Sequence, residues 1–94
     1  MGMVEENYLK AIKGNIERIK ELQQLSLELS AAVLENRADD PEGALRTEFS
    51  ALMEINSLYR DTVGLLDLVT SEENYFKANR YYKELQEFKP LTVG

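Results

Sequence analysis

Apolar side chains recur along residues 45–69 in two parallel series. The first series comprises Leu45, Phe49, Leu52, Asn56, Tyr59, Val63 and Leu66. The second series comprises Ala44, Ala51, Ile55, Leu58, Thr62, Leu65 and Val69. Spacing of about 3.5 residues is typical of a helix packed against other helices. Because a single partner cannot cover two neighbouring stripes, residues 45–69 are expected to form the central helix of an all-α bundle.

The residues before 45–69 have an apolar pattern that predicts one long helix over about 5–36. Its first half carries a narrow apolar stripe of Leu9, Ile12, Ile16 and Ile19. Its second half carries two stripes, one of Leu22, Leu25, Leu29 and Val33 and the other of Leu27, Ala31 and Leu34. The helix therefore changes from one buried side to two. Gly14 costs about 1 kcal/mol relative to Ala in a helix, and either a close helix crossing or a tolerated surface position would explain it.

Residues 37–40 predict the sharpest turn in the chain. Asp40 suits the N-cap of a second helix over about 41–69, Pro41 suits its first position, and Glu42 suits the positive end of the helix dipole. Because the connection is so short, the two long helices should lie antiparallel as a hairpin.

A third, shorter helix is predicted over about 71–88. Thr70 and Glu73 have the spacing of a capping box, and Pro90 would end the helix before a tail at 89–94. One long bent helix is the alternative to a break after Val69. Tyr75, Ala78, Tyr82 and Leu85 are expected to point inward. The sequence thus predicts a single helical domain over 1–94, an all-α three-helix up-down bundle.

The helix lengths predict an uncovered apolar surface near the 37–40 turn. A third helix that folds back spans about 25 Å at about 1.5 Å per residue, which is too short to reach the turn. The expected surface comprises Leu27, Ala31, Leu34, Ala44, Ala51 and Met53. Exposed apolar patches of this kind usually mark interaction sites. Alternatively, the third helix could cross diagonally and bury these residues. Asn56 could fix the register of the first series or lie at its edge in water.

Charge and composition narrow the classes of partner. The net charge is −6, which disfavours binding to nucleic acid and to anionic lipid. No apolar run approaches the roughly 18 residues needed for membrane insertion, and the N-terminus has no basic apolar leader. We therefore expect a cytoplasmic protein. The chain has no Cys, so disulfides and thiolate metal sites are excluded.

The sequence offers little catalytic chemistry. The absence of His removes the commonest general base and the Ser-His and Cys-His nucleophile pairs. The scattered glycines form no phosphate-binding loop. Asp39, Asp40 and Glu42 could hold a hard cation loosely, but helix capping explains them and their spacing does not fit an EF-hand. We expect no enzymatic activity, no cofactor and no metal.

These features favour a non-enzymatic protein-protein interaction module that self-associates, as a homodimer, or binds a partner helix through the apolar surface near the turn. Such an acidic helical hairpin is similar in outline to small secretion chaperones, including those of flagellar and type III export, and to phage and regulatory adaptor proteins. The alternative is a purely structural homodimer in which two hairpins pair their bare ends. An enzyme that uses carboxylates from helix faces is a third, weaker hypothesis.

Overall fold

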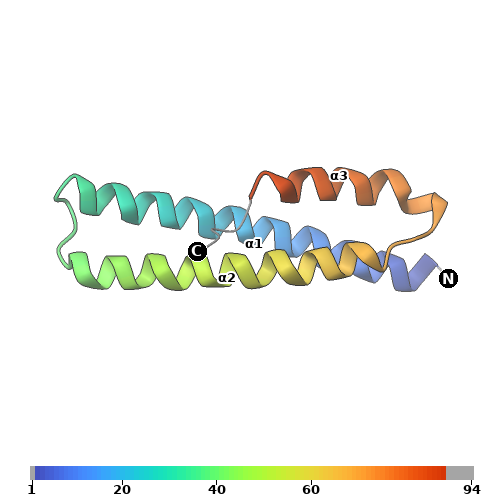
Figure 1. Ribbon diagram of the computed structural model, residues 1–94, viewed down its shortest axis with the longest axis horizontal. Coiled ribbons are helices and arrows are strands. Elements are labelled where there is room, and N and C mark those ends of the chain that lie inside the picture. The colour runs from blue at the N-terminus through green and yellow to red at the C-terminus, as the bar shows by residue number, and fades with distance from the viewer. Residues whose placement is uncertain (1, 89–94) are drawn as a thin grey trace, which may run out of the picture.

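The computed structural model describes residues 2–88, which form three α-helices and one short 3₁₀ turn. These are α1 (Gly2–Leu34), α2 (Pro41–Asp67), η1 (Glu72–Asn74) and α3 (Tyr75–Gln86). The helices α1 and α2 pack antiparallel as a hairpin, and the shorter α3 lies beside them (Figure 1). The predicted all-α fold, a hairpin with a shorter third helix, is confirmed. The tail predicted for 89–94 lies outside the described residues.

The turn between α1 and α2 begins with a Schellman motif. Asn36 adopts a left-handed conformation with φ of 57°, which asparagine tolerates better than most residues. The Arg37 N–H donates to the Ala32 carbonyl at 2.8 Å, and the Asn36 N–H donates to the Val33 carbonyl at 3.2 Å. These bonds satisfy carbonyl groups at the end of α1, which stops at Leu34, two residues earlier than expected.

The start of α2 agrees with the sequence prediction. Asp40 is its N-cap residue and accepts a hydrogen bond from the Gly43 N–H at 3.1 Å, while Pro41 occupies the first helical position. A Cβ atom on residue 43 would contact the Asp40 carboxylate. The capping side chain would have to shift to accommodate a larger residue at this position.

The apolar core lies between the helices in the half of the molecule that holds the N-terminus of α1. The buried apolar residues are Leu9, Ile12, Ile16, Ile19, Leu22, Ala51, Ile55, Leu66, Val69 and Leu85. The predicted stripe of the first half of α1 is thus confirmed. On α2, most of the residues that face α1 come from the second series. One of them, Thr62, is fully buried, and its hydroxyl donates to the Leu58 carbonyl at 2.6 Å.

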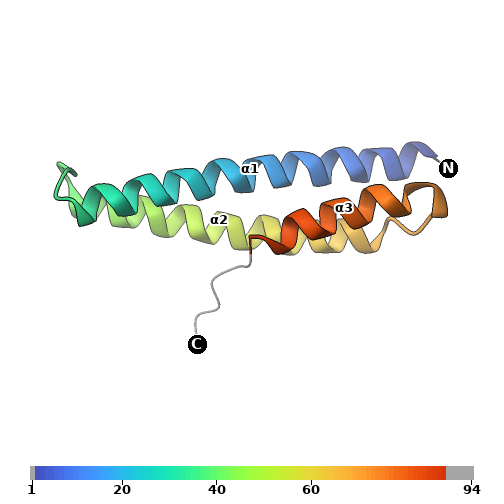
Figure 2. The same cartoon turned by 90° about the horizontal axis from the view of Figure 1, so that it is seen from above.

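A break separates α2 from α3, so the alternative of one long bent helix is wrong. The chain reverses after α2, and α3 runs antiparallel to α2 and parallel to α1 (Figure 2). Leu85 is 1% exposed and is the main anchor of α3, supported by the half-buried Ala78 and Tyr81. Tyr75 and Tyr82 are exposed, so their predicted inward orientation is wrong. The residues one position earlier, Asn74 and Tyr81, are buried and half-buried instead.

The molecule is elongated because its two long helices lie side by side along most of its length. Its extents are 53 × 26 × 16 Å, and its radius of gyration of 16.1 Å exceeds the about 13 Å of a compact chain of similar length. The 12 residues of α3 span about 18 Å, whereas the 27 residues of α2 span about 40 Å. Consequently α3 runs beside only one half of the hairpin (Figure 2). Within residues 2–88, no helix is long and apolar enough to cross a bilayer.

Candidate functional site

The half of the hairpin next to the turn, residues 23–53, has an unusually polar interior. We call this segment the turn half, and the structure describes all of it. Ala51 is its only buried apolar residue; the other buried side chain is Ser26. The Ser26 hydroxyl donates to Glu48 Oε1 at 3.4 Å between the two helices. A serine and a carboxylate therefore occupy positions that large apolar residues fill elsewhere in the hairpin.

Large apolar side chains of the turn half lie instead on its outside. The exposed ones are Leu25, Leu27, Leu34, Leu45, Phe49 and Met53. Their exposed fractions reach 64% for Phe49 and 81% for Leu34. Because Leu29, Val33 and Leu52 are only half-buried, the turn half has a weaker apolar core than the other half and keeps many of its large apolar side chains in solvent.

The residues predicted for this surface fall into three groups. Leu27, Leu34 and Met53 are exposed, and Ala31 and Ala44 are half-buried. The assignment of Ala51 to the surface is wrong.

Ala51 is 4% exposed because the second series on α2 packs against α1. The first series therefore faces sideways, and its members nearest the turn, Leu45 and Phe49, are exposed. Sequence reasoning missed these two residues because it placed them in the packed series.

The apolar residues of α1 lie on the flank along which α3 runs. Lys20, Leu27 and Leu34 follow one another at intervals of seven, so they share one side of α1. Lys20 Nζ forms an ion pair with Glu84 Oε1 of α3 at 3.1 Å. Leu27 and Leu34 therefore continue the same flank beyond the end of α3.

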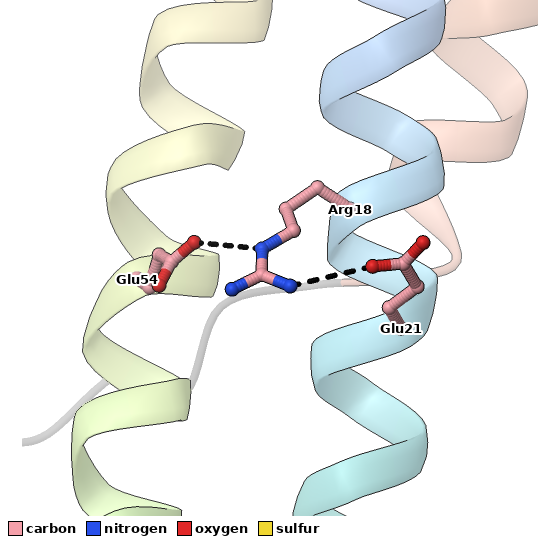
Figure 3. Close-up of polar contacts among 3 residues, drawn as sticks. All are labelled: Arg18, Glu21 and Glu54. Atoms are coloured by element: carbon pink, nitrogen blue, oxygen red, sulfur yellow. Dashed lines mark hydrogen bonds and ion pairs between the residues drawn. The ribbon is translucent and has the colours of Figure 1, made fainter.

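The opposite flank of the hairpin carries an ionic cluster that fixes the orientation of α2. Arg18 Nε donates to Glu54 Oε2 at 3.0 Å, and Arg18 Nη1 donates to Glu21 Oε2 at 3.3 Å (Figure 3). The hydrogen bonds to Glu54 and then Glu21 raise the pKa of Arg18. Leu45 lies nine positions before Glu54, which is about two and a half turns, so the two residues lie on opposite sides of α2. Leu45 therefore lies on the α3 side of the hairpin.

Both helices thus contribute to a single apolar surface. The hydrogen bond between Ser26 and Glu48 sets the antiparallel register and brings Leu27 level with the first turns of α2. We call this surface the turn-half face, and it comprises Leu27, Leu34, Leu45 and Phe49, with Met53 at its edge. The turn-half face lies on the same flank of the hairpin as α3, beyond the C-terminal end of that helix.

A second polar cluster, at the opposite end of the molecule, holds α3 in place. The Glu5 carboxylate accepts hydrogen bonds from the Ser71 hydroxyl and from the Asn74 side-chain amide, the latter at 2.7 Å. It also accepts the backbone N–H groups of Thr70 and Ser71, each at 3.3 Å. The hydrogen bonds from Ser71 and Asn74 are the main causes that lower the pKa of Glu5.

Glu5 thereby takes the role that the sequence assigned to a Thr70–Glu73 capping box. The N-cap of η1 is Ser71, whose side chain makes no capping bond within its own helix. Glu5 also selects the inward face of α3, because it binds Asn74 and leaves Tyr75 outside. The hydrogen bonds of Glu5 thus explain how the start of α3 docks on α1.

The acidic residues of the turn form no cation site of the kind considered from sequence. Asp40 is committed to the helix cap, and Glu42 lies 3.9 Å from Arg46. Across residues 2–88, no group of three or more His, Cys, Asp or Glu side chains is placed to hold a metal ion. In the same part of the chain, every buried side-chain nitrogen or oxygen has a hydrogen-bond partner.

Comparison of the chain with protein-family models, with curated proteins and with solved structures finds no match. Any function assigned to the chain must therefore come from its own geometry. The turn-half face gathers exposed leucine and phenylalanine side chains from both long helices, and it is unfavourable to leave such side chains in water.

Proposed function

We propose that this chain is a non-enzymatic interaction protein of the cytoplasm, which binds a helix of another protein on the turn-half face, in the manner of an adaptor or a secretion chaperone. One observation carries the proposal: α3 covers only one half of a flank of the hairpin, and exposed apolar side chains continue along that flank to the turn. Helix-in-groove recognition uses apolar anchors of this kind from a partner helix.

The half of the hairpin that α3 covers supplies an internal example of the proposed binding. There, α3 inserts the fully buried Leu85 against the hairpin and adds the peripheral Lys20–Glu84 ion pair. A partner helix would repeat this arrangement further along, with an apolar residue between Leu27 and Leu45. Burying a leucine or phenylalanine side chain stabilises a complex by about 1.5–3 kcal/mol before the costs of association.

The proposal is tested by a pull-down in which the captured proteins are quantified. It compares two variants, each with an exposed apolar residue replaced by glutamate. Leu34→Glu changes a residue that is 81% exposed on the turn-half face, and Phe76→Glu changes one that is 80% exposed on α3. Both variants should keep the helix content of the wild type by circular dichroism. Specific partners should be retained by wild type and Phe76→Glu and lost by Leu34→Glu. Equal capture by all three proteins would contradict the proposal.

A structural homodimer is the second candidate function. Two apolar stripes on adjacent helices make the turn half resemble half of a four-helix bundle, which a second copy could complete. Sedimentation at tens of micromolar distinguishes this candidate, because it requires a dimer that Leu34→Glu disrupts and Phe76→Glu does not. A wild-type monomer at that concentration would eliminate it.

A further inference from the structure

The charges around the turn-half face discriminate between the possible occupants of that face. The turn half contains six acidic residues and only two basic ones, so it carries −4 of the chain's net charge of −6. The acidic residues are Glu28, Glu35, Asp39, Asp40, Glu42 and Glu48. A surface of one sign attracts a partner of the opposite sign and repels its own copy.

The few basic groups in the turn half are already used locally. Arg37 pairs with Glu35, and Arg46 lies 3.9 Å from Glu42. Within the described chain, Glu28 accepts a hydrogen bond only from the neutral Gln24, at 3.2 Å. Among the carboxylates at the edge of the turn-half face, Glu28 therefore has no basic partner, and the turn half as a whole keeps its net charge of −4.

The acidic positions border the apolar ones on both helices. On α1, Glu28 and Glu35 are seven residues apart and each directly follows a leucine of the face, Leu27 or Leu34. On α2, Glu42 precedes Phe49 by seven residues and therefore lies on the same side. An apolar floor with an acidic edge on each side fits a helix that has an apolar stripe between basic flanks.

The uncovered stretch has the length of a single short helix. The Lys20–Glu84 ion pair places the end of α3 near residue 22 of α1, because α1 and α3 run in parallel. The rest of α1, residues 23–34, spans about 18 Å, which equals the length of α3 itself. One helix of three to four turns would therefore cover the uncovered stretch between the end of α3 and the turn.

We infer that the occupant of the turn-half face is a basic amphipathic helix of another protein, which lies end to end with α3. A second copy of this chain is disfavoured, because its turn half would bring another −4 against the first. This inference rests on the proposed function and specifies the chemistry of the partner.

The test uses two synthetic peptides of about 18 residues, a length at which a helix can form in isolation. Both carry leucines with the spacing i, i+3, i+4 and i+7, and they differ only in having Lys or Glu at the flanking positions. Binding to the intact protein is measured by fluorescence anisotropy at low ionic strength and again at 1 M salt. The Lys peptide should bind about tenfold more tightly than the Glu peptide at low salt. This preference should shrink at 1 M salt, where the Debye length is about 3 Å.

Two pairs of variants locate the binding site of the Lys peptide. Leu34→Glu should weaken its binding by about tenfold or more, whereas Phe76→Glu should leave it unchanged. Glu28→Lys should weaken its binding more than Glu17→Lys, which makes the same charge change on the exposed surface of the other half of α1.

Each contrary result overturns a different part of the inference. If the Glu peptide binds equally well and Leu34→Glu abolishes that binding, the basic partner is wrong while helix capture by the face stands. If neither peptide binds and the wild type dimerises through Leu34, the occupant is a second copy. If the Lys peptide binds Leu34→Glu as tightly as wild type, it adsorbs elsewhere and the turn-half face is not its site.

Discussion

Replacement of Leu85 by alanine should detach α3 from the hairpin without unfolding the hairpin. Leu85 is 1% exposed and is the only buried residue within α3. Truncation of a buried leucine to alanine costs about 2–5 kcal/mol, because apolar contact is lost and a cavity remains. Leu85 anchors the C-terminal part of α3, where the Lys20–Glu84 pair contributes only about 0–1 kcal/mol, whereas the Glu5 cluster holds only the start of α3.

A detached α3 should also lose its helical structure. Its 12 residues are at the lower limit of about 12–15 residues at which isolated helices become marginal in water. A loss of about 3 kcal/mol corresponds to a shift of roughly a hundredfold in the docking equilibrium. The protection of α3 amides from hydrogen exchange should therefore fall by roughly a hundredfold in Leu85→Ala, whereas amides around Ile12 and Ile16 should change little.

Native-state hydrogen exchange with residue resolution measures this effect, and Phe76→Ala is the matched control. Phe76 lies on the same helix, but its side chain is 80% exposed, so its truncation should leave α3 protected. An equal fall in protection across α1, α2 and α3 would refute the reasoning, because it would make α3 part of one cooperative unit. Unchanged protection of α3 would refute it as well, because Leu85 would then not be its anchor.

Three further predictions concern local features. Gly14→Ala should raise the free energy of unfolding by about 1 kcal/mol, since a Cβ there meets no atom within 4 Å; thermal denaturation would disprove this if the melting temperature fell. Asp40→Ala should lower stability by about 1 kcal/mol through loss of the cap on Gly43, and urea titration would count against the cap if the midpoint did not move. Because its folded-state pKa is lowered, Glu5 stabilises the fold above its unfolded-state pKa and loses this effect as pH falls through the folded-state value. Glu5→Gln should accordingly be less stable than wild type at pH 7, and the difference should shrink under acidic conditions; a pH-independent difference would contradict the assignment.

The features predictable from sequence are those whose causes lie within a few residues. The Asp40 cap and Pro41 act on a helix that begins next to them, so the turn and the antiparallel hairpin followed directly. The open position of Gly14 is consistent with the interpretation as a tolerated surface glycine. Helix lengths sufficed to predict that α3 would stop short of the turn.

The features that escaped prediction depend on pairing between distant segments. Either series of α2 could have faced α1, and the choice depends on how apolar side chains of the two helices pack together, as Ala51 and Ile55 do with the stripe on α1. For this reason Ala51 was placed on the surface and Phe49 inside, the reverse of what the structure has.

The start of α3 shows the same limit. Its inward face is chosen by Glu5, which is 69 positions away from Asn74 along the chain. A local capping pattern at Thr70 and Glu73 could not reveal this contact. Asn56 is only half-buried, as expected for a residue at the edge of its series.

The bonds of Glu5 impose an order on the assembly of the chain during synthesis. The Glu5 carboxylate emerges from the ribosome before the groups that donate to it, at positions 70–74, have been made. The two long helices can meet before those donors exist, because their contacts join residues closer together in the chain, such as Ser26 and Glu48. The newborn hairpin therefore leaves the whole of the flank along which α3 runs uncovered at first, and the later docking of α3 covers only one half of it.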